Sequence, residues 1–88
     1  MAYAVEISQA AARDLRRLPG RELVAIKKRI LALGLEPRPA SVRKIVDRER
    51  SYRIRVGVFR VIFDILDDRT TVVIARVLRR SETTYRRL

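Results

Sequence analysis

Residues 51–63, with the sequence SYRIRVGVFRVIF, constrain the fold of this chain more than any other stretch. Polar and apolar side chains alternate on both sides of Gly57-Val58, and a glycine-led connection of two residues predicts a β-hairpin with a type II′ turn. Cross-strand partners share a face of the hairpin. One face is then apolar, with Tyr52, Ile54, Val56, Phe59, Val61 and Phe63, and the other carries Arg53, Arg55 and Arg60.

Arg55 and Arg60 stand directly opposite each other in this predicted hairpin. Like charges in that position destabilise a sheet by roughly 0.2 to 1 kcal/mol per pair. The formal charge of the chain is +11, which favours nucleic acid, an acidic protein or an anionic surface as a partner. Of the 21 basic residues only three are Lys, and a predominance of Arg favours phosphate contact, although a GC-rich genome gives the same bias. The facing pair therefore predicts an anion-binding surface.

The segments before the hairpin predict a strand and two helices. Residues 3–7 alternate and predict a short strand, and Ser8 is a suitable N-cap for the helix that follows. This helix ends at Pro19-Gly20. Apolar residues then recur every three or four positions, which predicts a second amphipathic helix over about residues 21–33, with Gly34 as its left-handed cap.

Strands are also predicted on both sides of the hairpin. Residues 42–46 predict one before it, residues 64–66 extend its second strand, and residues 70–78 are rich in β-branched side chains and predict a central strand. Short connections make these successive strands antiparallel. The chain therefore predicts a single α+β domain over residues 1–88, with an N-terminal strand, a helical hairpin on one face of a small, mostly antiparallel twisted sheet, and a short C-terminal helix.

The register of the central strand decides which further side chains join the basic face. One register places Arg76 beside Arg60. The other places Val77 there and directs Arg79 to the same face. The alternation of the sequence is compatible with both registers.

The composition excludes several kinds of catalysis. The chain has no His and no Cys, so catalytic triads and the usual zinc sites cannot form. A carboxylate metal site of Asp64, Asp67 and Asp68 is conceivable, but these residues flank a predicted turn, where Asp is usually solvated or bonded to the backbone. We expect neither a metal nor a cofactor. No apolar run is long enough to span a membrane, so we expect a cytoplasmic protein without a membrane partner.

Phosphate chemistry without a metal remains. Cleavage of RNA by attack of a ribose 2′-OH requires stabilisation of charge on the phosphate, which Arg55, Arg60 and Arg79 can supply. It also requires proton transfer, for which Tyr85, in a final helix or turn capped by Ser81, is available. Stacking of Tyr85 on the edge of the sheet is the structural alternative. The same groups could also bind single-stranded RNA without cleaving it.

Several segments match a known pattern: Tyr3 to Ser8, Ala12 to Leu15, Leu18-Pro19, the stretch YRIRVG-x-FRVIF, and Arg79-Arg80 before Tyr85. Over nearly its whole length the chain resembles the RelE/ParE superfamily of toxins, and in particular the RelE-type mRNA interferases. The resemblance implies a RelE-like fold and a type II toxin that is neutralised by a small RelB-like antitoxin. Operator DNA would be bound only through the antitoxin, and the substrate would be mRNA in the ribosomal A site.

The resemblance also implies roles for individual residues. The catalytic positions are Arg55, Arg60, Arg79 and Tyr85, and the expected RNA-binding positions are Arg53, Lys44 and Arg80. Arg53 and Arg55 stand where active members carry Lys, whose pKa can shift enough for it to act as a base. Arg keeps its proton, so the general base is not identified.

Two other functions are compatible with the same resemblance and the same charge. Members of the ParE branch share the fold and inhibit DNA gyrase without nuclease chemistry, but they generally lack the set of Arg55, Arg60, Arg79 and Tyr85. A non-catalytic RNA- or ribosome-binding protein is the other alternative. The set of four residues favours the nuclease.

Overall fold

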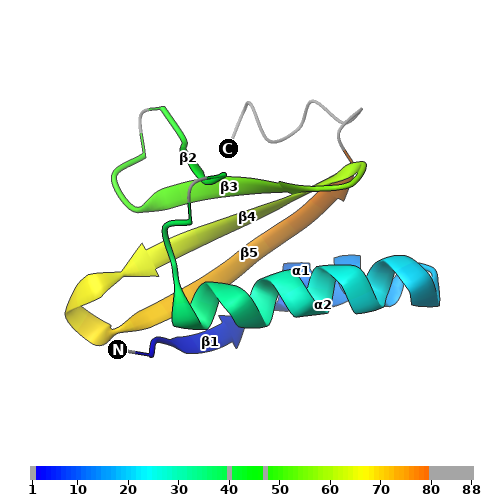
Figure 1. Ribbon diagram of the computed structural model, residues 1–88, viewed down its shortest axis with the longest axis horizontal. Coiled ribbons are helices and arrows are strands. Elements are labelled where there is room, and N and C mark those ends of the chain that lie inside the picture. The colour runs from blue at the N-terminus through cyan, green and yellow to red at the C-terminus, as the bar shows by residue number, and fades with distance from the viewer. Residues whose placement is uncertain (1, 40, 47, 80–88) are drawn as a thin grey trace.

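The computed structural model describes residues 2–39, 41–46 and 48–79, and in this part of the chain a five-stranded sheet is covered by two helices (Figure 1). The elements in chain order are β1 (Ala4–Ile7), α1 (Gln9–Arg16), α2 (Gly20–Leu35), β2 (Arg43–Lys44), β3 (Ser51–Val56), β4 (Phe59–Leu66), the short 3-10 helix η1 (Asp67–Arg69) and β5 (Thr71–Arg79). The predicted α+β class is confirmed. The predicted C-terminal helix lies outside the described residues.

The order of the strands in the sheet is β1-β5-β4-β3-β2. All neighbouring pairs are antiparallel except β1 and β5, which run parallel from Ala4 opposite Thr71 to Ile7 opposite Ile74. The two helices supply the long connection that leaves β1, and both lie on the same side of the long strands β3, β4 and β5 (Figure 1). The first strand thus pairs with the last strand described.

The core lies between α2 and the sheet. Ile26, Ile30 and Leu33 recur at helical spacing and are at most 3% exposed. They belong to one buried cluster with Ile54 and Phe63 of the hairpin. Because burial of one such side chain contributes about 1.5 to 3 kcal/mol, this cluster holds the hairpin against the helix. Neither described helix has the length and apolar character needed to cross a membrane.

Ser8 is the N-cap of α1, as predicted, and this helix covers the edge of β5 beyond the end of β1. The Ser8 hydroxyl accepts a hydrogen bond from the N–H of Ala11 at 3.0 Å and donates one to the carbonyl of Ala75 at 2.9 Å. Asp14 accepts the backbone N–H of Val77 at 2.8 Å. These contacts satisfy backbone groups that an edge strand would otherwise expose.

Gly34 does not cap α2, so this prediction is wrong. The helix continues to Leu35, and Gly57 is the only described glycine with a positive φ. A Cβ atom on Gly34 would lie 2.9 Å from Cγ2 of Val5 and 3.1 Å from the carbonyl oxygen of Tyr3. The N–H of Tyr3 also donates to the carbonyl of Gly34 at 2.7 Å. The glycine is required for the close approach of α2 to β1.

The strand predicted over residues 42–46 is shorter than expected. Only Arg43 and Lys44 form β2, because the chain turns immediately after them. The N–H of Ile45 donates to the carbonyl of Ser51 at 2.9 Å, and the N–H of Arg48 donates to the carbonyl of Ile45 at 3.3 Å. The turn leaves only two residues of β2 to pair with β3.

Candidate functional site

The hairpin of β3 and β4 has the predicted register. Arg55 lies opposite Arg60, and Val56 lies opposite Phe59 on either side of the turn. Gly57 has a φ of 60° whereas Val58 does not have a positive φ, as a type II′ turn requires. Because the apolar face is fixed in the core, the opposite face must carry the arginines.

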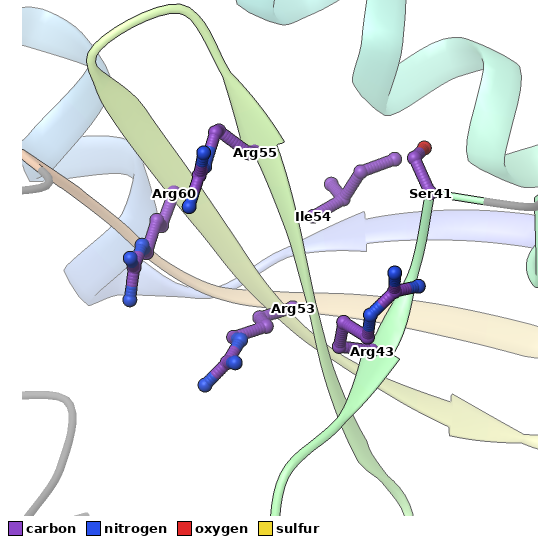
Figure 2. A pocket seen from close by; sticks show the side chains of 6 residues that line it. All are labelled: Ser41, Arg43, Arg53, Ile54, Arg55 and Arg60. Atoms are coloured by element: carbon purple, nitrogen blue, oxygen red, sulfur yellow. The ribbon is translucent and has the colours of Figure 1, made fainter.

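The basic residues surround a hollow of about 350 Å³ beside the hairpin. Its lining consists of Ser41, Arg43, Arg53, Ile54, Arg55 and Arg60, and none of these described residues is acidic. We call this concavity the basic hollow. Figure 2 shows the side chains of Arg53, Arg55 and Arg60 on the same side of the hairpin. The guanidinium of Arg43 is directed toward Ser41, and it donates to the carbonyl of Val42 at 3.0 Å.

Arg43 also lines the basic hollow, whereas the sequence predicts Lys44 as the RNA-binding residue of this segment. Arg43 pairs with Arg53, whereas Lys44 pairs with Tyr52. Cross-strand partners share a face, so Lys44 lies on the face of Tyr52, whose ring stacks on Phe63 with centroids 6.0 Å apart. The signal that identifies Arg43 is the antiparallel pairing of β2 with β3, which places Arg43 opposite Arg53.

The register of β5 differs from both alternatives considered above. Leu78, and neither Arg76 nor Val77, lies opposite Arg60. Arg76 is nevertheless on the face of Arg60, two pairs further along, opposite Ile62. The pairing shifts between Ile62 and Phe63, where β5 contains one additional residue.

Arg79 does not join Arg55 and Arg60 on the basic face. It lies opposite Phe59, and its guanidinium carbon is 5.2 Å from the centroid of the Phe59 ring. Arg79 therefore extends from the end of β5 next to the hairpin turn, on the other face of the sheet. Tyr85 and Arg80, the remaining candidate site residues, lie outside the described residues.

A second polar cluster connects the N-terminal strand to the 3-10 helix η1 after β4. Asp67 accepts from the Tyr3 hydroxyl at 2.6 Å and from Nη2 of Arg38 at 2.8 Å, and Arg38 lies 5.3 Å from the centroid of the Tyr52 ring. The hydrogen bond from Arg38, assisted by that from Tyr3, lowers the pKa of the Asp67 carboxyl. The hydrogen bond to Asp67 raises the pKa of the Tyr3 hydroxyl.

Two of the three acidic residues of the conceivable metal site, Asp64 and Asp67, have protein partners. Asp64 accepts from the Ser51 hydroxyl at 2.6 Å, and Asp67 forms the ion pair with Arg38. In the part of the chain that the structure describes, no three potential metal ligands are grouped together. The chemistry available at the basic hollow is the binding of anions by arginine side chains held on neighbouring strands.

Comparisons with known proteins all point to one family. Residues 5–84 match the family of ParE toxins of type II toxin–antitoxin systems, parDE. The chain is 40% identical to the toxin RelG of Mycobacterium tuberculosis over 99% of this chain and 100% of the relative. Its fold is similar to that of a chain in the RelBE2 toxin–antitoxin complex of Mycobacterium tuberculosis, with a TM-score of 0.78 and 34% identity over 90% of this chain and 99% of that one.

A further likeness is to the RelE–RelB complex of Pyrococcus horikoshii, with a TM-score of 0.82 and 25% identity over 94% of this chain and 100% of that chain. The match to the family model covers most of the sequence, and the identity to RelG extends over its full length. The chain therefore belongs to the RelE/ParE family of type II toxin–antitoxin toxins.

Proposed function

We propose that this toxin is a ribosome-dependent endoribonuclease, which cleaves mRNA in the ribosomal A site by 2′-OH attack without a metal. The observation that carries the proposal is the basic hollow, in which Arg55 faces Arg60 across the hairpin. Residues directly opposite in such a pair have Cβ atoms about 4.5 to 5.5 Å apart. Two arginine side chains that start from Cβ atoms at that spacing can both reach a single phosphate.

The arginines would act on the charge that develops at phosphorus. Attack of the 2′-OH places additional negative charge on the phosphate oxygens, and donors that are already oriented toward them stabilise the transition state more than the ground state. Arg55 and Arg60 are suited to this role because their backbones are fixed in the sheet. Arg53 and Arg43 line the same hollow and would bind the neighbouring backbone of the RNA.

Proton transfer requires other groups, since a guanidinium keeps its proton. Tyr85 is proposed as the residue that transfers a proton, with Arg80 and Lys44 as further contacts to RNA. Arg79 extends from the end of β5, and its proposed role is to approach the phosphate from the side of the hairpin turn. The carboxylates Asp64 and Asp67 are engaged elsewhere, which favours a phenol over a carboxylate.

The same proposal includes a RelB-like antitoxin as the partner that silences the toxin. The solved relatives named above are complexes of RelE-type toxins with their antitoxins. A chain with a formal charge of +11 suits an acidic partner as well as RNA. Operator DNA would be bound through the antitoxin, and the site of action would be the cytoplasm.

The test is single-turnover cleavage of mRNA in a translating extract. We expect Arg60→Ala to slow cleavage about 100-fold or more, because removal of one oriented donor typically has this effect. Arg21→Ala is the matched control, since Arg21 is an exposed arginine at the start of α2, outside the hollow. Cleavage by Arg60→Ala at the wild-type rate would contradict the proposal.

The alternatives predict different results in the same preparation. If the protein inhibits the supercoiling of DNA by gyrase and leaves mRNA uncleaved, it is a gyrase-directed toxin, the activity associated with the ParE branch. Binding to ribosomes or RNA with no cleavage by the wild-type protein would identify a non-catalytic binding protein. Either result would replace the nuclease proposal.

A further inference from the structure

The basic hollow continues beyond the hairpin to the segment that precedes β2. Because β2 pairs with only two residues of β3, no described strand pairs with this edge of β3 from Ile54 onward. Ile54 and Ser41 both line the hollow. Figure 2 shows Ser41 and Arg60 on opposite sides of β3. The hollow therefore extends past the open edge of the sheet, from the arginines of the hairpin to Ser41.

Arg29 of α2 contacts this far wall of the hollow. Its Nη2 donates a hydrogen bond to the hydroxyl oxygen of Ser41 at 3.2 Å. Arg29 is half-buried, and the next residue, Ile30, is packed in the core, so the backbone of α2 is fixed at this position. The contact holds a cation of the helix beside the hollow that the hairpin arginines line from the other side.

The charge of Arg29 is not neutralised within the part of the chain that the structure describes. No described carboxylate forms an ion pair with Arg29, and none does so with Arg55, the exposed arginine of the hollow. A guanidinium has several N–H donors, and the hydrogen bond to Ser41 uses one of them. Arg29 can therefore bind an anion and keep its contact with Ser41.

Ser41 supplies a neutral donor at the same place. Its hydroxyl oxygen accepts from Arg29, and among the described residues no acceptor takes the hydroxyl proton. A hydroxyl can donate one hydrogen bond while it accepts another. Phosphate oxygens accept from arginine and from serine side chains, and such contacts position nucleic acids on proteins. The pair of Arg29 and Ser41 is therefore suited to a phosphate of an RNA backbone.

We propose that Arg29 and Ser41 bind a second phosphate of the RNA, further along the strand than the phosphate held by Arg55 and Arg60. The RNA backbone leaves the hairpin, crosses the open edge of β3 and reaches α2. The proposal rests on RNA being the substrate of the basic hollow. It gives Arg29 and Ser41 a role in holding the strand rather than in the reaction.

The experiment measures binding of 2′-O-methylated RNA, which cannot be cleaved by 2′-OH attack, by fluorescence anisotropy at several salt concentrations. A dinucleotide, which has a single phosphodiester, is compared with a longer single-stranded RNA. We expect Arg29→Ala to weaken binding of the longer RNA about fivefold or more and to reduce the slope of log K against log salt by about 0.7, the value for one phosphate contact on a single strand. Binding of the dinucleotide should not change.

Lys28→Ala is the matched control, because it removes a positive side chain from the adjacent exposed position of α2, which does not line the hollow. It should change neither the affinity for the longer RNA nor the salt slope as much. Ser41→Ala should weaken binding of the longer RNA about threefold with an unchanged salt slope, because the lost hydrogen bond involves no charge on the serine. Ser41→Thr keeps the hydroxyl and should bind more tightly than Ser41→Ala.

Equal effects of Arg29→Ala and Lys28→Ala on both RNAs would overturn the second phosphate site. An equal loss of affinity for the dinucleotide and the longer RNA in Arg29→Ala would also overturn it. Under either result, weaker binding of the dinucleotide by Arg60→Ala would leave the RNA site of the basic hollow, and with it the proposed nuclease, intact. Unchanged binding of the dinucleotide by Arg60→Ala would remove that site as well.

Discussion

The carboxylate of Asp14 lies 2.8 Å from the backbone nitrogen of Val77, so a side chain of α1 completes the hydrogen bonding of a strand in the sheet. The same carboxylate binds the guanidinium of Arg76. A contact of this kind joins residues that are distant in the sequence, and it fixes the end of β5 from which Arg79 extends.

Asp14→Ala should lower the free energy of unfolding by about 2 kcal/mol or more. The substitution leaves the buried N–H of Val77 without its acceptor and removes one partner of Arg76. An unsatisfied buried donor alone costs about 1 to 3 kcal/mol. Urea denaturation followed by circular dichroism measures the change. Asp14→Asn keeps an acceptor oxygen and should cost less, so an equal loss in both variants would contradict this account.

Gly34→Ala should destabilise the protein although alanine is the better helix former. The added Cβ meets Cγ2 of Val5 at 2.9 Å and the backbone oxygen of Tyr3 at 3.1 Å, and overpacking of this kind costs about 1 to 3 kcal/mol. Gly20→Ala is the control, because nothing lies within 4 Å of its added Cβ. The midpoint of thermal unfolding should fall in Gly34→Ala, and it should rise or stay unchanged in Gly20→Ala.

The cluster of Asp67, Arg38 and Tyr3 should make stability depend on pH at both extremes. Because the folded-state pKa of Asp67 is lowered, its contribution is present above the unfolded value near pH 4 and is lost as the pH falls through the folded value. Because the pKa of Tyr3 is raised, its contribution is present below about pH 10 and is lost as the pH rises through the folded value. The midpoints of urea unfolding of the wild type and of Asp67→Asn should therefore converge below about pH 4. If the two midpoints were identical at every pH, the cluster would not contribute to stability.

Arg55→Thr should make the protein more stable and less able to bind RNA. It removes the repulsion between Arg55 and Arg60, which is on the order of 0.2 to 1 kcal/mol, and introduces a residue with high strand propensity. Added phosphate should stabilise the wild type more than this variant, since a ligand that binds only the folded state raises its stability. The check is thermal unfolding with and without phosphate. An equal response of both proteins would mean that Arg55 does not contribute to anion binding.

Much of the fold follows from local patterns. Strict alternation around Gly57 determined the register of β3 and β4, and the hydroxyl of Ser8 marked the start of α1. The role of Gly34 could not be predicted, because it depends on a contact with Val5 of β1, which is distant in the sequence. A glycine after an apolar helix predicts a cap only when no neighbouring strand requires the space.

The candidate site was predicted less completely than the fold, and one reason is a single additional residue in β5. Val72, Ile74 and Val77 are all buried, so the spacing of core positions changes from two to three at the irregularity. Beyond this point each side chain faces the opposite way from the one that regular alternation predicts. Arg79 therefore lies against Phe59, on the face away from Arg60.

The parallel pairing of β1 with β5 has a consequence for how the toxin is made. Ala4 emerges from the ribosome long before its partner Thr71, and loop closure over such a distance makes the contact slow and late. β4 gains its second neighbour in the sheet only from β5, so the core cannot close on the nascent chain until β5 has been synthesised. A polypeptide proposed to attack translating ribosomes thus passes through most of its own translation without its folded sheet.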